Sequence, residues 1–201
     1  MPRYSEDQRE TIKSDTRQRL IHAALKEFAH YGYEQANVNR ISEAAGFAKG
    51  TVYNYFPSKQ ALMLALIEEI GNAHVSWMKE GIRSETSPSQ RLGALFNAGF
   101  AYVEQRPSEA HFLLTTLYGA GDEFRQAMGK VYQPLFRLVA AEILAPGIEQ
   151  GVFRPMDPYR TATLLMTLYL GTASQVDEAN KTWLNAEEVT AFAWQAIKNG
   201  D

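Results

Sequence analysis

The chain has 201 residues, of which 45% are hydrophobic and 21% charged, and its net charge is −3. This composition is ordinary for a globular protein and argues against intrinsic disorder. Because there is no cysteine, disulfides, thiolate catalysis and cysteine-ligated zinc are excluded, and the scattered histidines lack the spacing of a metal site. We therefore expect neither a metal nor a cofactor.

The charge is unevenly distributed along the chain. Residues 1–60 hold nine Lys/Arg against seven Asp/Glu, a net +2, whereas residues 61–201 hold eleven against sixteen, a net −5. A mildly basic head on an acidic body favours a small DNA-binding module joined to a regulatory domain. The N-terminal residues lack an apolar signal core, and residues 161–176 are too short and too rich in threonine to be a convincing membrane span. We expect a cytoplasmic protein without a membrane partner.

Helical periodicity dominates the first third of the chain. It predicts four helices, at residues 15–31, 38–45, 49–56 and 59–82. Asp15 and Gln18 open the first of these as a capping box, and Gly32 ends it. Ser58 can cap the fourth. Residues 1–14 are expected to form a flexible arm, for which a solvated tail is favoured over a contact with the minor groove of DNA.

The rest of the chain continues the helical pattern. Further helices are predicted at residues 88–106, 108–118, 122–151, from 158 and from 186, the third of these kinked or broken at Pro134 and at Pro146-Gly147. No segment alternates apolar and polar residues convincingly, so no sheet is expected. The predicted fold is all-α with about nine helices, divided into the arm, a helix-turn-helix domain at 15–60 and a ligand-binding and dimerisation domain at 61–201.

Residues 42–56 have the spacing of a helix-turn-helix. Such a turn needs a glycine with positive φ, a small residue four positions earlier and an aliphatic residue six positions later. Gly46, Ser42 and Val52 satisfy these requirements. Spacing alone leaves open an ordinary helical corner with buried rings. The outward positions carry groups suited to base edges and phosphates, at Lys49, Gly50, Thr51, Asn54 and Tyr55.

The stretch RISEAAGFAKGTVYNYFPSKQAL at residues 40–62 resembles the DNA-binding sequence of the tetracycline-repressor (TetR) family. The resemblance implies a three-helix DNA-binding module, a connecting helix and a helical domain that binds a ligand and dimerises. It implies DNA contacts from Asn37, Asn39, Lys49, Gly50, Thr51, Tyr53, Asn54, Tyr55 and Lys59. The sequence departs from the family pattern at Ala48, where a capping serine is usual, and at Asn37, where threonine is commoner.

The body is rich in aromatic rings, which for any single residue more often form plain core than a pocket. Together with the resemblance, an apolar ligand pocket is expected, with candidate residues Trp77, Phe100, His111, Phe112, Tyr118, Tyr132 and Tyr169. The helix around 162–173 is apolar on nearly every side, so either its own chain buries it or a twin covers part of it. The resemblance implies a four-helix dimer interface, with candidates Leu165, Leu168, Tyr169, Val189, Phe192 and Ala196.

These features favour a sequence-specific transcriptional regulator that acts as a homodimer. A repressor is expected, bound to a palindromic double-stranded operator and released by a small, largely apolar effector. The alternative is a helical-bundle enzyme or carrier without a DNA role, but the sequence shows no catalytic constellation. An architectural DNA-binding protein is a third hypothesis, which the acidic body disfavours.

Overall fold

The computed structural model describes residues 5–119, 121–177 and 181–200. Its elements are α1 (Glu6–Gln35), α2 (Val38–Ala44), the 3-10 turn η1 (Thr51–Asn54), α3 (Lys59–Arg83), α4 (Pro88–Gln105), α5 (Pro107–Gly119), α6 (Asp122–Leu138), the π-helical segment η2 (Val139–Leu144), α7 (Ala145–Glu149), α8 (Pro158–Ala173) and α9 (Ala186–Ile197). The all-α prediction is confirmed, and about nine helices is close to what is observed. Among the described residues no helix is long and apolar enough to cross a membrane.

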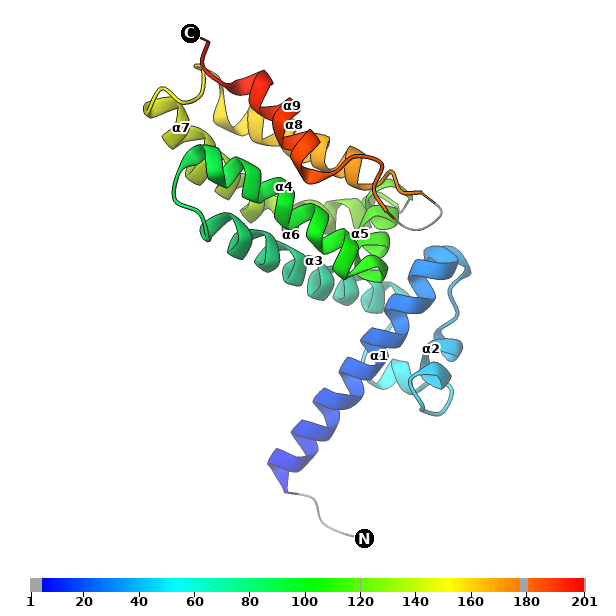
Figure 1. Cartoon of the computed structure of the whole chain (residues 1–201). Coiled ribbons are helices and arrows are strands. Elements are labelled where there is room, and N and C mark those ends of the chain that lie inside the picture. The colour runs from blue at the N-terminus through cyan, green and yellow to red at the C-terminus, as the bar shows by residue number, and fades with distance from the viewer. Residues whose placement is uncertain (1–4, 120, 178–180, 201) are drawn as a thin grey trace.

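A small head and a larger helical body make up the molecule (Figure 1). The head consists of α1, α2 and η1, and α3 connects it to the body. Within the body α3 packs against α4 and α6, and α9 packs against α4. Helices α8 and α9 lie on the side of α4 that faces away from the head. The head and the body are thus joined both through α3 and through a contact between α1 and α5.

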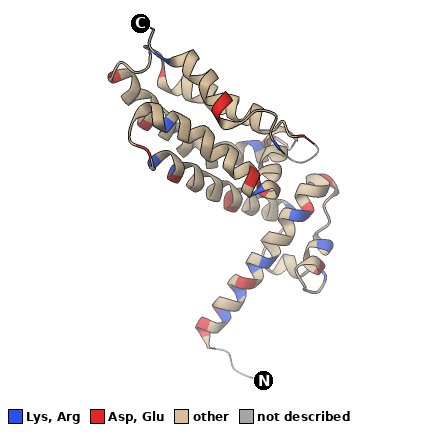
Figure 2. Ribbon diagram, in the orientation of Figure 1, with Lys and Arg blue, Asp and Glu red and all other residues tan. Residues whose placement is uncertain are grey.

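Helix α1 starts earlier than the sequence predicts. It begins at Glu6, where Ser5 and Gln8 form a reciprocal capping box, and not at Asp15. The expected flexible arm is therefore wrong for residues 6–14, because a second capping box lies upstream of the expected one. Residues 1–4 lie outside the described residues. The first half of α1 projects from the head and carries charges of both signs (Figure 2).

Several helix boundaries follow from caps that the sequence contains. The side chain of Ser58 caps α3, Ser87 with Gln90 forms the capping box of α4, and Asn185 with Glu188 forms that of α9. Gly32 adopts φ +69° inside the residues assigned to α1, so the regular helix stops there as predicted. Each of these caps satisfies backbone groups that a helix end leaves unpaired.

The long helical pattern at 122–151 is divided at only one of its two prolines. Helix α6 continues through Pro134, so the chain does not break at this proline. Before Pro146 the chain widens into η2. Proline has no N–H, so the carbonyl of Glu142, four residues earlier, cannot accept the bond that an α-helix would supply. The Nη1 of Arg91 donates to that carbonyl at 3.0 Å, which satisfies it from α4.

Candidate DNA-binding surface and body cavity

The turn between α2 and η1 has the geometry that the sequence predicts. Gly46 adopts φ +81°, and Ser42 and Val52 are completely buried. The hydroxyl of Ser42 accepts the backbone N–H of Val52 at 3.3 Å and donates to the carbonyl of Val38 at 3.3 Å. A small side chain at position 42 therefore joins the segments before and after the turn.

Arg19 of α1 holds this turn from the side, and nothing in the sequence pattern pointed to it. Its Nη2 donates to the carbonyl of Ala45 at 2.7 Å, and its guanidinium lies 4.6 Å from the ring centroid of Phe47. A Cβ at Gly46 would come within 2.8 Å of that same nitrogen. Only glycine therefore fits the turn without displacing Arg19.

The prediction of a helix at 49–56 is wrong, because among these residues the structure contains only one 3-10 turn. Gly50 adopts φ +79° immediately before Thr51, a conformation that interrupts a helix, and η1 has no side-chain cap. Ala48 stands where a capping hydroxyl is usual, and only its carbonyl contributes, by accepting the N–H of Thr51 at 3.1 Å. The short turn still separates one inward side chain, Val52, from its outward neighbours.

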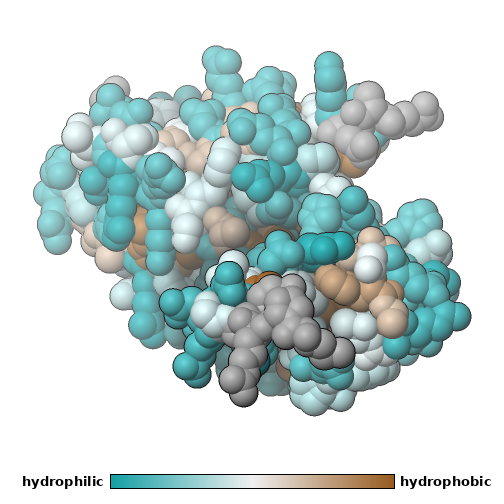
Figure 3. Space-filling model, turned by 90° about the horizontal axis from the view of Figure 1, so that it is seen from below, coloured by the Kyte–Doolittle hydropathy of each residue, from teal (hydrophilic) through white to brown (hydrophobic). Residues whose placement is uncertain are grey.

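The side chains expected to touch DNA divide into an exposed and a partly buried group. Asn37, Asn39, Lys49, Tyr53 and Asn54 are exposed, Tyr53 by 52%, whereas Gly50, Thr51, Tyr55 and Lys59 are half-buried. Viewed from the side from which α1 projects, the surface is mostly hydrophilic, with small hydrophobic patches between (Figure 3). The chain after Gly46 thus offers polar groups outward, as the helix-turn-helix prediction requires.

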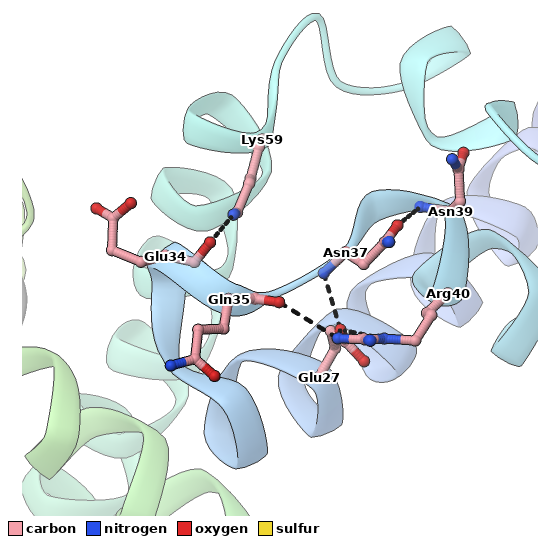
Figure 4. A network of polar contacts seen from close by, with 7 residues as sticks. All are labelled: Glu27, Glu34, Gln35, Asn37, Asn39, Arg40 and Lys59. Carbon is pink, nitrogen blue, oxygen red and sulfur yellow. Dashed lines mark hydrogen bonds and ion pairs between the residues drawn. The ribbon is translucent and has the colours of Figure 1, made fainter.

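A polar network fixes the start of α2 (Figure 4). The Glu27 carboxylate accepts the backbone N–H of Asn37 and the Nε of Arg40, each at 2.8 Å. The Asn37 side chain in turn accepts the N–H of Asn39 at 2.9 Å, which makes Asn37 the cap of α2. The network holds Asn37 and Asn39 at the exposed end of α2.

Lys59 is less free than expected. Its Nζ donates to the carbonyl of Glu34 at 3.0 Å and lies 4.9 Å from the ring centroid of Tyr33. Only one of its three N–H donors is used by that carbonyl, so donors remain for an anion. Lys49 forms an exposed ion pair with Glu43 at 3.4 Å, a contact that contributes little and that a phosphate can replace.

The body contains an apolar cavity of about 140 Å³ bounded by α3, α4, α5, α6 and α8. Three hydrogen-bonding side chains meet at its polar side: Nδ1 of His74 lies 2.5 Å from the hydroxyl oxygen of Tyr132, and Nε2 lies 3.4 Å from that of Tyr169. The ring of Tyr102 packs on the imidazole with centroids 4.2 Å apart. These polar groups are buried and hydrogen-bond to one another.

The ligand residues expected from the sequence are dispersed. Tyr132 and Tyr169 line the cavity, whereas Phe100 is buried in the core without lining it and Trp77 donates to the carbonyl of Ala98 in a shallow groove between α3 and α4. The remaining three candidates also lie outside the cavity. Phe112 is buried at the joint between head and body, and His111 and Tyr118 are exposed. His74 and Tyr102 were missed, although a lone histidine on the apolar side of α3 was a visible signal.

The head matches the family model described as "Bacterial regulatory proteins, tetR family" over residues 20–66. The chain is similar to the "Fatty acid metabolism regulator protein" of Bacillus subtilis (strain 168), with 26% identity over 165 residues, 82% of this chain and 81% of that protein. It is also similar to the "HTH-type transcriptional repressor KstR2" of Mycolicibacterium smegmatis, with 26% identity over 147 residues, 69% of this chain and 68% of that protein.

The chain carries the DNA-binding domain of the TetR family at residues 20–66. It is a DNA-binding transcriptional regulator. Solved structures share the fold of this chain. A regulator in the tetR family from Rhodococcus matches with TM-score 0.78 and 17% identity, covering 92% of this chain and 98% of that one. FadR from Bacillus subtilis, solved in complex with stearoyl-CoA, matches with TM-score 0.73 and 21% identity, covering 89% and 95%.

The outer faces of α8 and α9 differ from what was expected. Leu165, Tyr169 and Val189 are buried within the chain itself, so these candidates face their own core and not a partner. Leu168 is half-buried, whereas Phe192 and Ala196 are exposed, as an interface requires. Leu164, which was not among the predicted interface residues, is 69% exposed on α8, and Phe192 is 67% exposed on α9. An apolar helix cannot indicate from its sequence which side its own chain covers.

Burial lowers the pKa of His74 from 6.5 to about 4, so the fold holds this imidazole neutral. In the unfolded chain it binds a proton below its ordinary pKa. His74 therefore leaves the free energy of unfolding unchanged above about pH 6.5 and lowers it progressively as the pH falls toward about 4. Between about pH 7.5 and pH 5 this residue should remove about 2 kcal/mol from the free energy of unfolding.

Urea denaturation at the two pH values tests this expectation. The variant His74→Gln lacks the titrating group, so its loss of stability on acidification should be smaller by about that amount. An equal loss in the parent and the variant would show that other groups carry the acid sensitivity. Comparing the pH difference within each protein makes the result independent of the variant's lower overall stability.

Proposed function

We propose that this chain is a homodimeric repressor that binds a palindromic operator and leaves it when a small molecule occupies the body cavity. The observation that carries the proposal is the outward polar surface after Gly46, on a head that packs against a body containing an apolar cavity. The DNA-binding domain would comprise residues 15–60, preceded by the first part of α1, and the ligand-binding and dimerisation domain would comprise residues 61–201. The name of KstR2 as a repressor supports the sign of regulation.

In this proposal the segment after Gly46 enters the major groove. Lys49, Gly50, Thr51 and Asn54 would approach base edges, and Asn39 would reach a neighbouring base. Asn37, Tyr53, Tyr55 and Lys59 would contact the phosphate backbone. Backbone contacts position the head and base-edge contacts select the sequence. In a dimer two such surfaces would meet half-sites about 34–36 Å apart.

The dimer is supported by the exposed apolar side chains on the outer faces of α8 and α9. Leu164 and Phe192 are large, exposed and on adjacent helices that form one side of the body. Large apolar side chains gathered on one surface indicate a protein interface more often than isolated ones do. A second copy of the chain would cover the same patch by two-fold symmetry.

A route from the cavity to the head begins in α6. Met128 lines the cavity, and Phe124, one turn earlier on the same helix, packs against Tyr33 of the head with ring centroids 4.6 Å apart. Beside this pair the side chain of Gln60 donates to Glu123. A ligand that shifts α6 would therefore move a contact surface of the head. Such a shift changes DNA affinity only if the ligand binds more tightly to one of the two positions of α6 than to the other.

Fluorescence anisotropy with labelled promoter DNA from beside the protein's own gene tests this proposal. We expect nanomolar, sequence-selective binding that a metabolite extract weakens. Binding that ignores sequence would support an architectural protein instead. Absence of binding to this and to other promoters of the source genome would support the helical-bundle alternative.

A further inference from the structure

The size of the body cavity limits the ligand to about one ring. Its volume of about 140 Å³ is close to the roughly 150 Å³ of an engineered apolar cavity that holds a single benzene molecule. Leu113, Leu117, Met128, Phe136 and Leu170 form much of the apolar wall. These walls favour a compact apolar ligand and leave no room for a long acyl chain.

The hydrogen bonds at the polar side determine which group the cavity can recognise. The carbonyl of Gly99 can only accept, so the hydroxyl of Tyr169, 3.3 Å away, donates to it. Nε2 of His74 must then carry the proton that points to the Tyr169 oxygen, and Nδ1 is left as an acceptor. The hydroxyl of Tyr132 therefore donates to Nδ1 at 2.5 Å.

This arrangement leaves the oxygen of Tyr132 as an acceptor. Its proton is committed to His74, and within the part of the chain that the structure describes no donor is directed at its lone pairs. The other phenol nearby, Tyr102, donates to Glu109 at 2.5 Å and is engaged elsewhere. A ligand that brings its own O–H or N–H donor would complete the hydrogen bonds of Tyr132.

The polar side of the cavity also carries no charge. Burial keeps His74 neutral by lowering its pKa, and burial raises the pKa of Tyr132 and Tyr169, so these hydroxyls stay protonated. Among the described residues that line the cavity, the charged one is Arg125, which is exposed and ion-paired with Asp122. A carboxylate placed against His74 would be buried without a counter-charge, at a large cost.

We propose that the cavity binds a neutral molecule of about one ring that carries a hydroxyl or N–H donor, such as a simple phenol, and that Tyr132 accepts the hydrogen bond from it. The proposal rests on the assignment of the cavity as the effector site. It separates this chain from the FadR structure with stearoyl-CoA, whose ligand is long and anionic.

Isothermal titration of the full-length protein with five probes tests the proposal. The probes are 4-ethylphenol, ethylbenzene, acetophenone, 4-ethylbenzoate and stearoyl-CoA. We expect 4-ethylphenol to bind about 5- to 10-fold more tightly than ethylbenzene, because one neutral hydrogen bond is gained. Acetophenone, which can only accept, should show no such gain, and 4-ethylbenzoate and stearoyl-CoA should not bind measurably.

The variant Tyr132→Phe assigns the recognition to one atom. It should bind 4-ethylphenol and ethylbenzene equally, while the matched variant Tyr118→Phe, whose phenol is exposed, should keep the preference. Survival of the preference in Tyr132→Phe would overturn the proposal. Tighter binding of acetophenone, 4-ethylbenzoate or stearoyl-CoA than of 4-ethylphenol, or no binding of any probe, would overturn it as well.

The failure of this inference is distinguishable from that of the proposed function. Titration measures ligand binding without DNA, and anisotropy with operator measures release. If a metabolite extract releases the operator but 4-ethylphenol does not bind, the regulator proposal stands and the ligand class is wrong. If 4-ethylphenol binds but never weakens operator binding, the ligand class stands and the cavity is not the effector site.

Discussion

Replacing Phe192 with glutamate is expected to convert the dimer into monomers and to lower operator affinity by about 100-fold or more. Phe192 is 67% exposed on α9, so the substitution removes little of the protomer's own packing. In the proposed dimer it would place two charges, one from each copy, in a buried apolar contact. Without dimerisation each head binds alone, and the gain from two linked half-sites is lost.

Analytical ultracentrifugation and anisotropy on the same samples measure both effects. The matched control is Tyr118→Glu, which introduces the same charge at a residue 60% exposed at the end of α5. The control should remain dimeric and bind operator like the parent. A dimeric Phe192→Glu protein would contradict the interface at α8 and α9, and a monomer with parental affinity would contradict two-site binding.

Replacing Asn54 with alanine is expected to reduce the preference for operator over unrelated DNA by about 5- to 150-fold, the range for one lost base contact. Asn54 is exposed at the end of η1, and its carboxamide offers both a donor and an acceptor to a base edge. Because the residue carries no charge, the dependence of affinity on salt should not change.

Competition anisotropy at several salt concentrations separates these outcomes. Asn72→Ala removes the same side chain from an exposed position on α3 in the body and should behave like the parent. Equal discrimination by Asn54→Ala and the parent would rule out a base contact by this residue. A changed salt slope with unchanged discrimination would assign Asn54 to the phosphate backbone instead.

Local chemistry made the caps and the turn predictable. Ser58, Ser87 and Asn185 cap helices because their side-chain oxygens reach backbone N–H groups a few residues away. Gly46 adopts a positive φ because the helix crossing requires it. The same local reasoning missed the start of α1, because Ser5 and Gln8 form a capping box as competent as the one chosen at Asp15.

Features that depend on several helices were not predictable from the sequence. The polar side of the cavity unites His74, Tyr132 and Tyr169 from three helices, and no spacing along the chain indicates that they meet. Arg19 supports the turn from α1, which α2 separates from the turn along the chain. On α8, Leu164 and Leu165 are adjacent and equally apolar, yet only one is exposed, because the neighbours of a helix decide which side is covered.

Protection of the operator from dimethyl sulfate tests the central claim most directly, that the chain after Gly46 presents its polar side chains to the major groove. The reagent methylates guanine at N7 in the major groove and adenine at N3 in the minor groove. We expect protection of guanine N7 in two half-sites about one helical turn apart. Protection confined to adenine N3, or none in a saturated complex, would contradict the account.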